Sequence, residues 1–257
     1  LSIDQSTQGT KAMLFDAAGQ LTARVDRAHR QYVNEKGWVS HDLDEILSNT
    51  LAVARDVLAK ADVWPEQIVA VGISNQRETV AAWNRTTGEP VGKAIVWQCA
   101  RAKDICEKLT AHADTVQQKT GIPLSPYFSA PKMAWILQNE PGAAELAEKN
   151  ELCFGTIDSF LVSHLTEEKA FKTDYSNASR TQLFNIHTLQ WDEELCRIYG
   201  VPETCLPEVC MSDSVFGYTT FGGLLKTPVP LCGVLGDSHA ALLGQNCRTP
   251  GQTKATY

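Results

Sequence analysis

The chain contains 257 residues, of which 43% are hydrophobic and 21% are charged, an ordinary composition for a globular protein. A chain of this length buries about 70–75% of its unfolded surface, so it needs no disulfide or metal to hold a core. Its formal net charge of −7 argues against a nucleic-acid partner, because neutralising phosphates takes a surplus of Lys and Arg.

The opening of the chain predicts adjacent antiparallel strands. Residues 1–4, 11–15 and 20–31 have strand character, and polar turns separate them. Residues 42–61 then carry apolar side chains at helical spacing, with acids in the first turn, and so predict a helix. The apolar run over residues 68–74 predicts a buried strand.

The rest of the chain alternates between strands and helices. We expect further strands at residues 79–83, 95–97, 214–220, 229–234 and 253–257. We expect helices at residues 100–109, 132–139, 142–148, 157–165, 191–199, 202–206 and 238–245. Residues 173–180 are polar and predict a loop. This order of elements predicts a mixed α/β fold with a central sheet flanked by helices.

Eight scattered cysteines form no Cys-x-x-Cys pair, which indicates buried free thiols in a reducing cytoplasm rather than disulfides or structural zinc. No apolar run approaches the roughly 20 residues of a membrane helix. The chain begins at Leu1 inside a predicted strand and stops at Tyr257 inside another. We therefore expect a cytoplasmic domain cut from a longer protein.

The turn between the first two strands could bind phosphate. It begins with Asp4 and ends with Lys11, and small hydroxyl residues and a glycine lie between them. Such a turn can offer backbone N–H groups to a phosphate, and Asp4 could hold Mg²⁺ directly or through water. An ordinary hairpin turn of the same composition explains these residues better when they are taken alone.

Three further segments carry side chains suited to a polyol. Arg77 and Glu78 follow the buried strand at residues 68–74, where open α/β sheets bind ligands, and could hold two hydroxyls. The alternative is a surface ion pair. Trp97 and Tyr127 could form an aromatic wall, although core packing explains Trp97 better when it is taken alone.

Asp237 follows a predicted strand and Gly236, and begins the last predicted helix. It could simply cap that helix. It could also present a carboxylate to a cleft and accept a proton from an attacking hydroxyl. His239, two residues later, is better explained as a packed or solvated side chain than as a ligand.

Taken in order, these segments resemble the carbohydrate kinases of the FGGY family. The similarity is carried by residues 4–11, 72–79, 94–99, 127–139, 173–189 and 236–242. Within the family, the chain is most similar to the glycerol kinases. The stretches span nearly the whole chain.

The resemblance implies an actin-like, ribonuclease-H-like α/β fold with a central mixed sheet. It also implies that residues 1–257 are the substrate-binding N-terminal domain, and that a C-terminal domain binding most of ATP is absent from this chain. The implied reaction is ATP-dependent phosphorylation of a primary hydroxyl, with glycerol giving glycerol 3-phosphate. Family members often form dimers or tetramers, and no nucleic acid or membrane is implied as a partner.

The resemblance assigns roles to matching positions. Asp237 would be the general base, and Asp4 and Asp237 the acids near Mg²⁺. The first phosphate-binding turn would contain Thr7, Gln8 and Lys11. The polyol would contact Arg77, Glu78, Trp97, Tyr127, Asp237 and Ser238.

The sequence departs from the family pattern at three places. Ser238 stands where glycerol kinases usually have an amide residue, which leaves another polyol or a ketose, such as erythritol or xylulose, as an alternative substrate. The opening turn carries Lys11 where arginine is commoner. Residues 222–227 lack the loop that binds fructose 1,6-bisphosphate in some bacterial relatives, so we expect that regulation to be weak or absent. A non-catalytic sensor and an actin-like filament module are further alternatives, and the intact Asp4, Arg77, Glu78 and Asp237 argue against a sensor.

Overall fold

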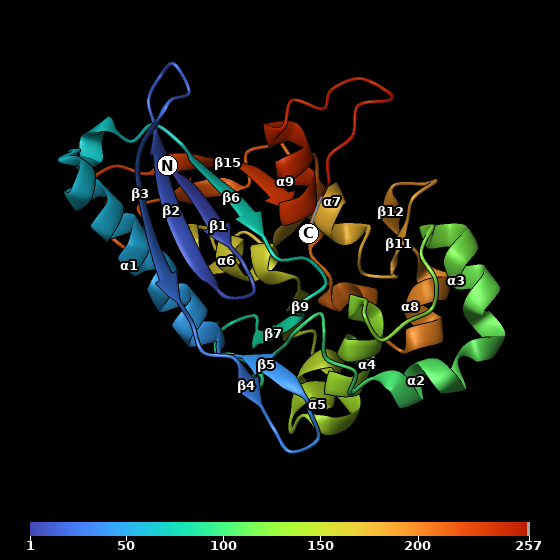
Figure 1. Ribbon diagram of the computed structural model, residues 1–257. Helices are drawn as coiled ribbons and strands as arrows, with labels where there is room; N and C mark the ends of the chain where they lie inside the picture. Colours follow the sequence, from blue (N-terminus) through green and yellow to red (C-terminus); the bar gives the residue numbers. More distant parts are fainter. Residues whose placement is uncertain (256–257) are drawn as a thin grey trace.

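The computed structural model describes residues 1–255. Its largest sheet contains β1 (Ser2–Gln5), β2 (Gly9–Phe15), β3 (Leu21–Ala28), β6 (Val71–Asn75), β14 (Gly217–Thr219) and β15 (Val229–Gly236). The strands lie in the order β14-β15-β6-β1-β2-β3 (Figure 1). The sheet is mixed, because β1, β6 and β15 are parallel neighbours while the outer pairs are antiparallel. The carboxyl ends of β1, β6 and β15 therefore meet at one edge.

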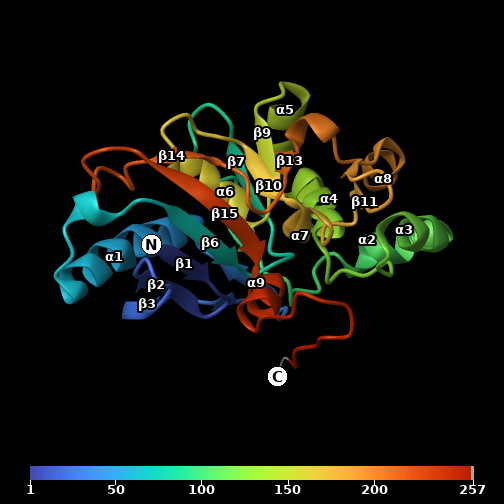
Figure 2. The ribbon, with the colours of Figure 1, turned by 90° about the horizontal axis from the view of Figure 1, so that it is seen from above.

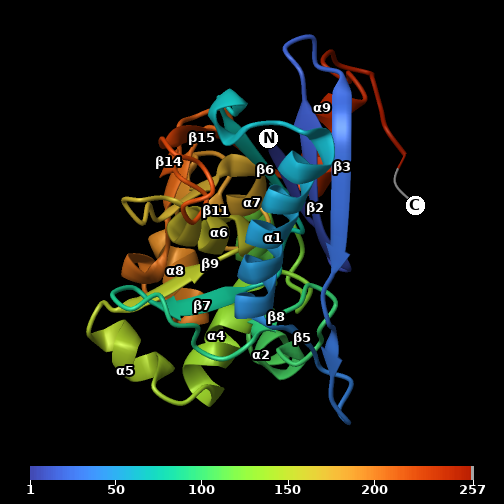
Figure 3. The ribbon, with the colours of Figure 1, turned by 90° about the vertical axis from the view of Figure 1, so that its left-hand side faces the viewer.

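The first long helix, α1 (Leu43–Ala61), covers one face of this sheet. It begins at Asp42, whose carboxylate accepts a hydrogen bond from Glu45 N, and it ends at Asp62 in the left-handed conformation. Its apolar side packs against β2 and β3 (Figure 3). Buried side chains from α1, the sheet and α6 (Ile157–Leu165) form one apolar core, including Ile3, Val53 and Phe160.

A second apolar core lies beside the first. Its helices are α3 (Ala113–Thr120), α4 (Ser129–Asn139), α5 (Ala143–Glu148) and α8 (Glu193–Tyr199). The helix α2 (Lys103–Lys108) packs on α4 through a small separate cluster that contains Ile105 and Ala134. The strands of the second core form the small sheets β4-β5-β8 (Tyr32–Val33, Val39–His41, Ala94–Ile95), β7-β9 (Ala81–Asn84, Leu152–Gly155) and β11-β12 (Phe184–Asn185, Gln190–Trp191). Figure 2 shows α2, α3 and α8 on the far side of α4 from the large sheet. The chain passes from the first core to the second directly after β6, through residues 76–80.

Short elements complete the fold. They are the strands β10 (Lys172–Asp174) and β13 (Glu208–Cys210), the helices α7 (Tyr175–Ala178) and α9 (Asp237–Gly244), and the single 3₁₀ turns η1 (Pro65–Gln67), η2 (Thr110–His112) and η3 (Glu203–Cys205). The strand β10 pairs in parallel with β13, and α7 contacts both β10 and β15.

The predicted mixed sheet and every predicted helix are present, with boundaries shifted by a few residues. The loop predicted at residues 173–180 was wrong, because β10 and α7 occupy most of it. Asp174 caps α7 by accepting hydrogen bonds from Ser176 N and Asn177 N, so a single helical turn forms without an apolar period. The strand predicted at residues 253–257 is absent over 253–255, and 256–257 lie outside the described residues.

All eight cysteines are free thiols, and five of them are buried as predicted. Cys210, Cys232 and Cys247 are partly exposed. Burial raises the pKa of Cys106 to about 11 and that of Cys153 to about 12. Within residues 1–255, no helix has both the length and the apolar character needed to cross a membrane.

Candidate active site

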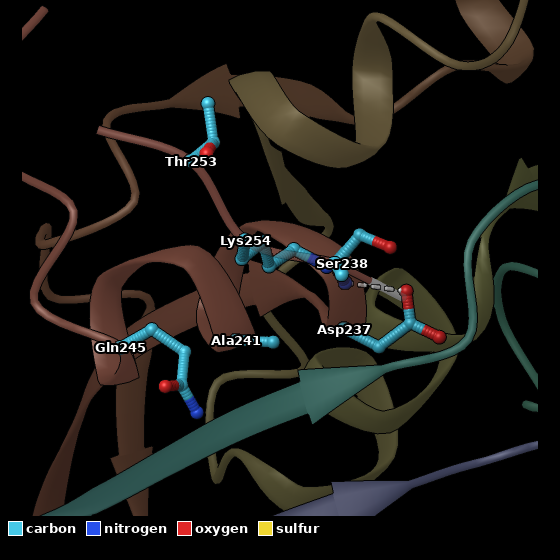
Figure 4. A pocket seen from close by; sticks show the side chains of 7 residues that line it. Asp237, Ser238, Ala241, Gln245, Thr253 and Lys254 are labelled. Carbon is cyan, nitrogen blue, oxygen red and sulfur yellow. Dashed lines mark hydrogen bonds between the residues drawn. The ribbon is translucent and has the colours of Figure 1, made fainter. Parts of the chain in front are cut away.

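Asp237 is the first residue of α9, at the carboxyl end of β15. The helix cap is Gly236, so the interpretation of Asp237 as the cap was wrong by one residue. The Asp237 Oδ1 atom accepts a hydrogen bond of 2.6 Å from the backbone of Ser238 (Figure 4). The side chain stays 44% exposed. A carboxylate in this position is held in one orientation but remains open to a ligand.

Arg77 connects the end of β6 with the start of α9. Its Nε donates to Asp237 Oδ1 over 3.1 Å, and one terminal nitrogen donates to Ser238 Oγ over 3.0 Å. Gly236 makes this approach possible, because a Cβ atom there would lie 2.5 Å from Arg77 Cδ and 2.6 Å from Cγ. Both hydrogen bonds that the Asp237 carboxylate accepts within residues 1–255 use Oδ1, and Oδ2 accepts none.

Glu78 is buried and has an unusual backbone conformation, with φ at +61°. Such a conformation is costly for a residue with a side chain, and functional sites often contain it. Its carboxylate accepts a 2.5 Å hydrogen bond from Arg180 Nε, and its backbone carbonyl accepts one from Ser129 Oγ. The alternative interpretation of Arg77 and Glu78 as a surface ion pair was wrong, since each pairs with a residue far along the chain.

Trp97 and Tyr127 lie together, as the predicted aromatic wall requires. Their ring centroids are 5.5 Å apart at an interplanar angle of 55°. Trp97 Nε1 donates to Thr7 Oγ1 over 2.9 Å, which joins the aromatic pair to the opening turn. Tyr127 is 37% exposed, and partial burial raises the pKa of its hydroxyl.

The opening turn faces a cavity of about 250 Å³, whose lining includes Ser6, Gln8, Gly9 and Lys11. Lys11 Nζ lies 2.7 Å from Asp4 Oδ2, and Ser74 Oγ donates to Asp4 Oδ1. A cationic side chain beside a small cavity and a glycine suits an anion.

The two acids predicted near Mg²⁺ come from the ends of β1 and β15, the strands on either side of β6. Asp4 pairs in register with Ser74, and Gly236 with Asn75, so one strand separates Asp4 from Asp237. Two strand spacings put their backbones about 10 Å apart. Within residues 1–255 there is no group of three His, Cys, Asp or Glu side chains suited to a metal. Two carboxylates fit an ion that is held largely by phosphate and water oxygens.

A buried polar network behind Asp237 was missed by the sequence analysis. The backbone N–H of Gly236 donates to Ser176 Oγ over 2.8 Å, and Ser176 Oγ donates to Asp174 Oδ2 over 2.6 Å. Asn177 exchanges hydrogen bonds with Asn75 at the end of β6. The pattern Asp174-Tyr-Ser-Asn177, an acid before small polar residues, is a helix-cap signal that could have revealed α7.

A cavity with a volume of about 690 Å³ lies beside Asp237. It is lined by Asp237, Ser238 and Ala241 of α9, by Gln245 just after that helix, and by residues 253–255 (Figure 4). Among the described residues, Arg77, Glu78, Trp97 and Tyr127 do not line it. Asp237 thus lies between this cavity and the side chains predicted to hold a polyol.

Comparison with known proteins identifies the family. Residues 1–244 match the model of the FGGY family of carbohydrate kinases, N-terminal domain. The whole chain is 46% identical to a glycerol kinase of Pseudothermotoga lettingae and 50% identical to one of Alcanivorax borkumensis, and covers 52% of each relative. The chain therefore spans about half the length of the curated relatives it matches.

Solved structures support the same fold. The crystal structure of Plasmodium falciparum glycerol kinase with ADP matches 96% of this chain and 50% of its own, at 35% identity and a TM-score of 0.90. A ligand-bound xylulose kinase from Lactobacillus acidophilus has a TM-score of 0.83 at 22% identity, over 96% of this chain and 50% of its own, and shows the shared fold alone. The actin-like, ribonuclease-H-like fold class is confirmed. The chain belongs to the FGGY family of carbohydrate kinases.

Proposed function

We propose that this chain is the substrate-binding domain of an ATP-dependent kinase that phosphorylates a primary hydroxyl of a small polyol, with glycerol giving glycerol 3-phosphate. The observation that carries the proposal is the Asp237 carboxylate, which Arg77 and the Ser238 backbone hold through one oxygen while the other accepts no hydrogen bond within residues 1–255. The identity to glycerol kinases over the whole chain supports glycerol as the substrate.

In this proposal the attacking hydroxyl donates its proton to Asp237. General-base catalysis of this kind contributes about 10²–10⁴-fold to a rate. Arg77 and Glu78 hold the other hydroxyls, and Tyr127 and Trp97 contact the carbon chain. Phosphoryl transfer needs little more from a protein than such positioning and the stabilisation of charge.

The nucleotide phosphates would contact the opening turn, through Thr7, Gln8 and Lys11. Asp4 and Asp237 would hold Mg²⁺ through phosphate and water oxygens, and the ion would neutralise charge on the phosphates when bound. Residues 1–257 act as the N-terminal domain, and a C-terminal domain supplies most ATP contacts. The isolated chain is then expected to bind a polyol but to turn over ATP poorly. ATP and eight reduced cysteines both suit the cytoplasm.

Ser238 supports a second candidate substrate within the same chemistry. Its hydroxyl accepts from Arg77 and it lines the 690 Å³ cavity, so a short side chain stands where a longer one would fill space. A larger polyol or a ketose, such as erythritol or xylulose, could occupy that volume.

A substrate panel tests the proposal. The full-length protein that carries this chain is assayed for phosphorylation of glycerol, erythritol, xylulose and gluconate with ATP, and the chain of residues 1–257 is titrated with the same compounds by calorimetry. We expect the highest kcat/KM with glycerol, and polyol binding by the chain alone. Equal rates with all four compounds would exclude glycerol as the specific substrate. Fast ATP-dependent turnover by residues 1–257 would show that the nucleotide site lies within this chain.

A further inference from the structure

Lys132 is fully buried in the first turns of α4, and its ammonium binds three consecutive backbone carbonyls. Nζ lies 2.8 Å from Pro126 O, 2.5 Å from Tyr127 O and 2.9 Å from Phe128 O. The side chain has 0% exposure. Its long stem points back toward the start of the helix, as helical side chains do. The middle one of the three carbonyls belongs to Tyr127.

Two physical rules disfavour a lysine at this position. A buried cation loses its hydration, and a cation near a helix N-terminus is repelled by the helix dipole. Three carbonyl dipoles that converge on one point also repel one another. These costs are offset only when the ammonium lies between the three carbonyl oxygens and binds all of them. The turn at residues 126–128 and Lys132 therefore depend on each other.

The number of acceptors indicates the charge state. An ammonium has three N–H donors, which matches the three carbonyls, whereas a neutral amine has two and would point a lone pair at the third oxygen. Burial lowers the pKa of Lys132 to about 7, and the carboxylate of Glu78 opposes that change. The other groups near it are the Cys99 and Cys106 thiols, which raise the pKa, and Arg101, which lowers it.

Few other contacts hold Tyr127. Its backbone N–H donates to Ser125 Oγ over 3.2 Å, and its ring touches Trp97 and Phe128, at centroid distances of 5.5 Å and 5.2 Å. The carbonyl bond from Lys132 is thus the shortest polar contact of this residue and the one that comes from the helix.

We propose that Lys132 is a positioning residue: by binding the carbonyls of Pro126, Tyr127 and Phe128, it holds the Tyr127 ring beside Trp97. The expected effect of Lys132 on polyol binding rests on the function proposed above. The effect of Lys132 on the position of the Tyr127 ring does not depend on that function. Lys132 touches no substrate and acts through Tyr127.

The first experiment measures the position of the ring without any ligand. Aromatic NMR signals of Tyr127, assigned by their loss in Tyr127→Phe, carry ring-current shifts from Trp97 and Phe128. In Lys132→Met and Lys132→Gln, these signals are expected to move toward random-coil positions. The matched control is Lys119→Met on α3, which removes a half-buried lysine paired with Asp192 and Glu194. This substitution should leave the Tyr127 signals unchanged. Tyr127 signals at wild-type positions in either folded Lys132 variant would overturn the proposal.

The second experiment measures glycerol affinity by calorimetry on the same chains. Lys132→Met should weaken binding about tenfold, the size of one lost hydrogen bond. In a Tyr127→Ala background, Lys132→Met should cause almost no further loss of glycerol affinity, since both substitutions remove the same interaction. Additive losses would show that Lys132 does not act through Tyr127. If the wild-type chain binds no polyol, the proposed function fails, and the ring signals still decide the role of Lys132.

A third measurement needs no variant and decides the case if neither variant folds. Below pH 7, a protected Lys132 ammonium should give a slowly exchanging Nζ signal with hydrogen-bond couplings to the carbonyl carbons of residues 126–128. When the pH is raised and this signal is lost, the Tyr127 ring signals should shift with the same midpoint. Absence of the couplings would contradict the proposal. Tyr127 ring signals that do not shift when the ammonium signal is lost would contradict it too.

Discussion

Arg77 and Asp237 form an ion pair across 160 positions of the sequence, with Nε 3.1 Å from Oδ1. The pair exists because β6 and β15 are parallel neighbours whose carboxyl ends meet. Arg77 is only 17% exposed, so its guanidinium is held more firmly than a surface side chain. The same group donates to Ser238 Oγ. The orientation of the candidate base therefore depends on Arg77 as well as on α9.

Replacement of Gly236 by alanine should displace Arg77. The new Cβ would lie 2.5–2.6 Å from Arg77 Cδ and Cγ, which are too close to the backbone to move cheaply. We expect a loss of about 1–3 kcal/mol in the free energy of unfolding, as for overpacking, together with weaker polyol binding. Chemical denaturation and calorimetry measure the two effects.

Gly233→Ala is the matched control. Gly233 lies on the same strand, and an added Cβ would meet nothing within 4 Å. The free energy of unfolding should change little, and polyol affinity should not change. Equal effects from the two substitutions would mean that the contact between Gly236 and Arg77 has no special role.

Asp237→Asn tests the base directly. The amide keeps nearly the same shape but cannot accept a proton, so kcat of the full-length protein should fall by about 10²–10⁴-fold. Polyol affinity of the chain should change much less. Asp213→Asn, at an exposed position outside the proposed site, should leave the rate unchanged. A rate retained in the Asp237 variant would remove Asp237 from the role of base.

The sequence located the strand ends of this site better than it predicted the side-chain pairs found there. Apolar runs that stop at polar residues placed Arg77 and Asp237 each just after a strand, and the structure has β6 and β15 there. The partner of a side chain that lies far along the chain cannot be predicted from the local sequence pattern. The carboxylate of Glu78 is paired with Arg180, 102 positions away, and nothing near either residue indicates the other.

Several of the elements that were missed have no apolar period, although α3 was also missed. The helix α7 has four residues, too few for an apolar repeat, and it forms because Asp174 caps it. The strand β9 is buried on both faces and follows α5 after a short turn, so its apolar run merges with the helical pattern around it. Lys132 is polar yet fully buried, which no composition rule predicts.

Ser176→Ala should loosen the segment that carries the base. The Ser176 hydroxyl accepts from Gly236 N and donates to Asp174, so its removal leaves a buried N–H without a partner. We expect about 1–3 kcal/mol of lost stability and faster amide exchange at Gly236 and Asp237. Ser179→Ala, in the adjacent turn, removes one bond to a carbonyl and should cost less. Unchanged amide exchange at Gly236 would show that Ser176 does not hold it.

Asp158 should make stability depend on pH. Its carboxyl group is fully buried, and burial, reinforced by nearby Asp174, raises its pKa to about 7. Hydrogen bonds from Thr156 and Thr173 oppose the rise without cancelling it. Between the unfolded value of 3.8 and about 7, the folded chain holds a proton that the unfolded chain has released. The protonated form therefore contributes stability that is fully present below pH 3.8 and is lost as the pH rises toward 7.

Asp158→Asn has no such proton, so the difference in unfolding free energy between wild type and variant isolates this one group. That difference should move in favour of the variant as the pH rises from 5 to 7, by at most about 1.4 kcal/mol per pH unit, and should level off above that range. Urea denaturation of both proteins at several pH values measures it, and the titration of groups that do not interact with Asp158 cancels in the comparison. A constant difference across the range would mean that Asp158 is ionised throughout, held by the Thr156 and Thr173 hydroxyls and the Asn75 amide, all of which can donate to a carboxylate.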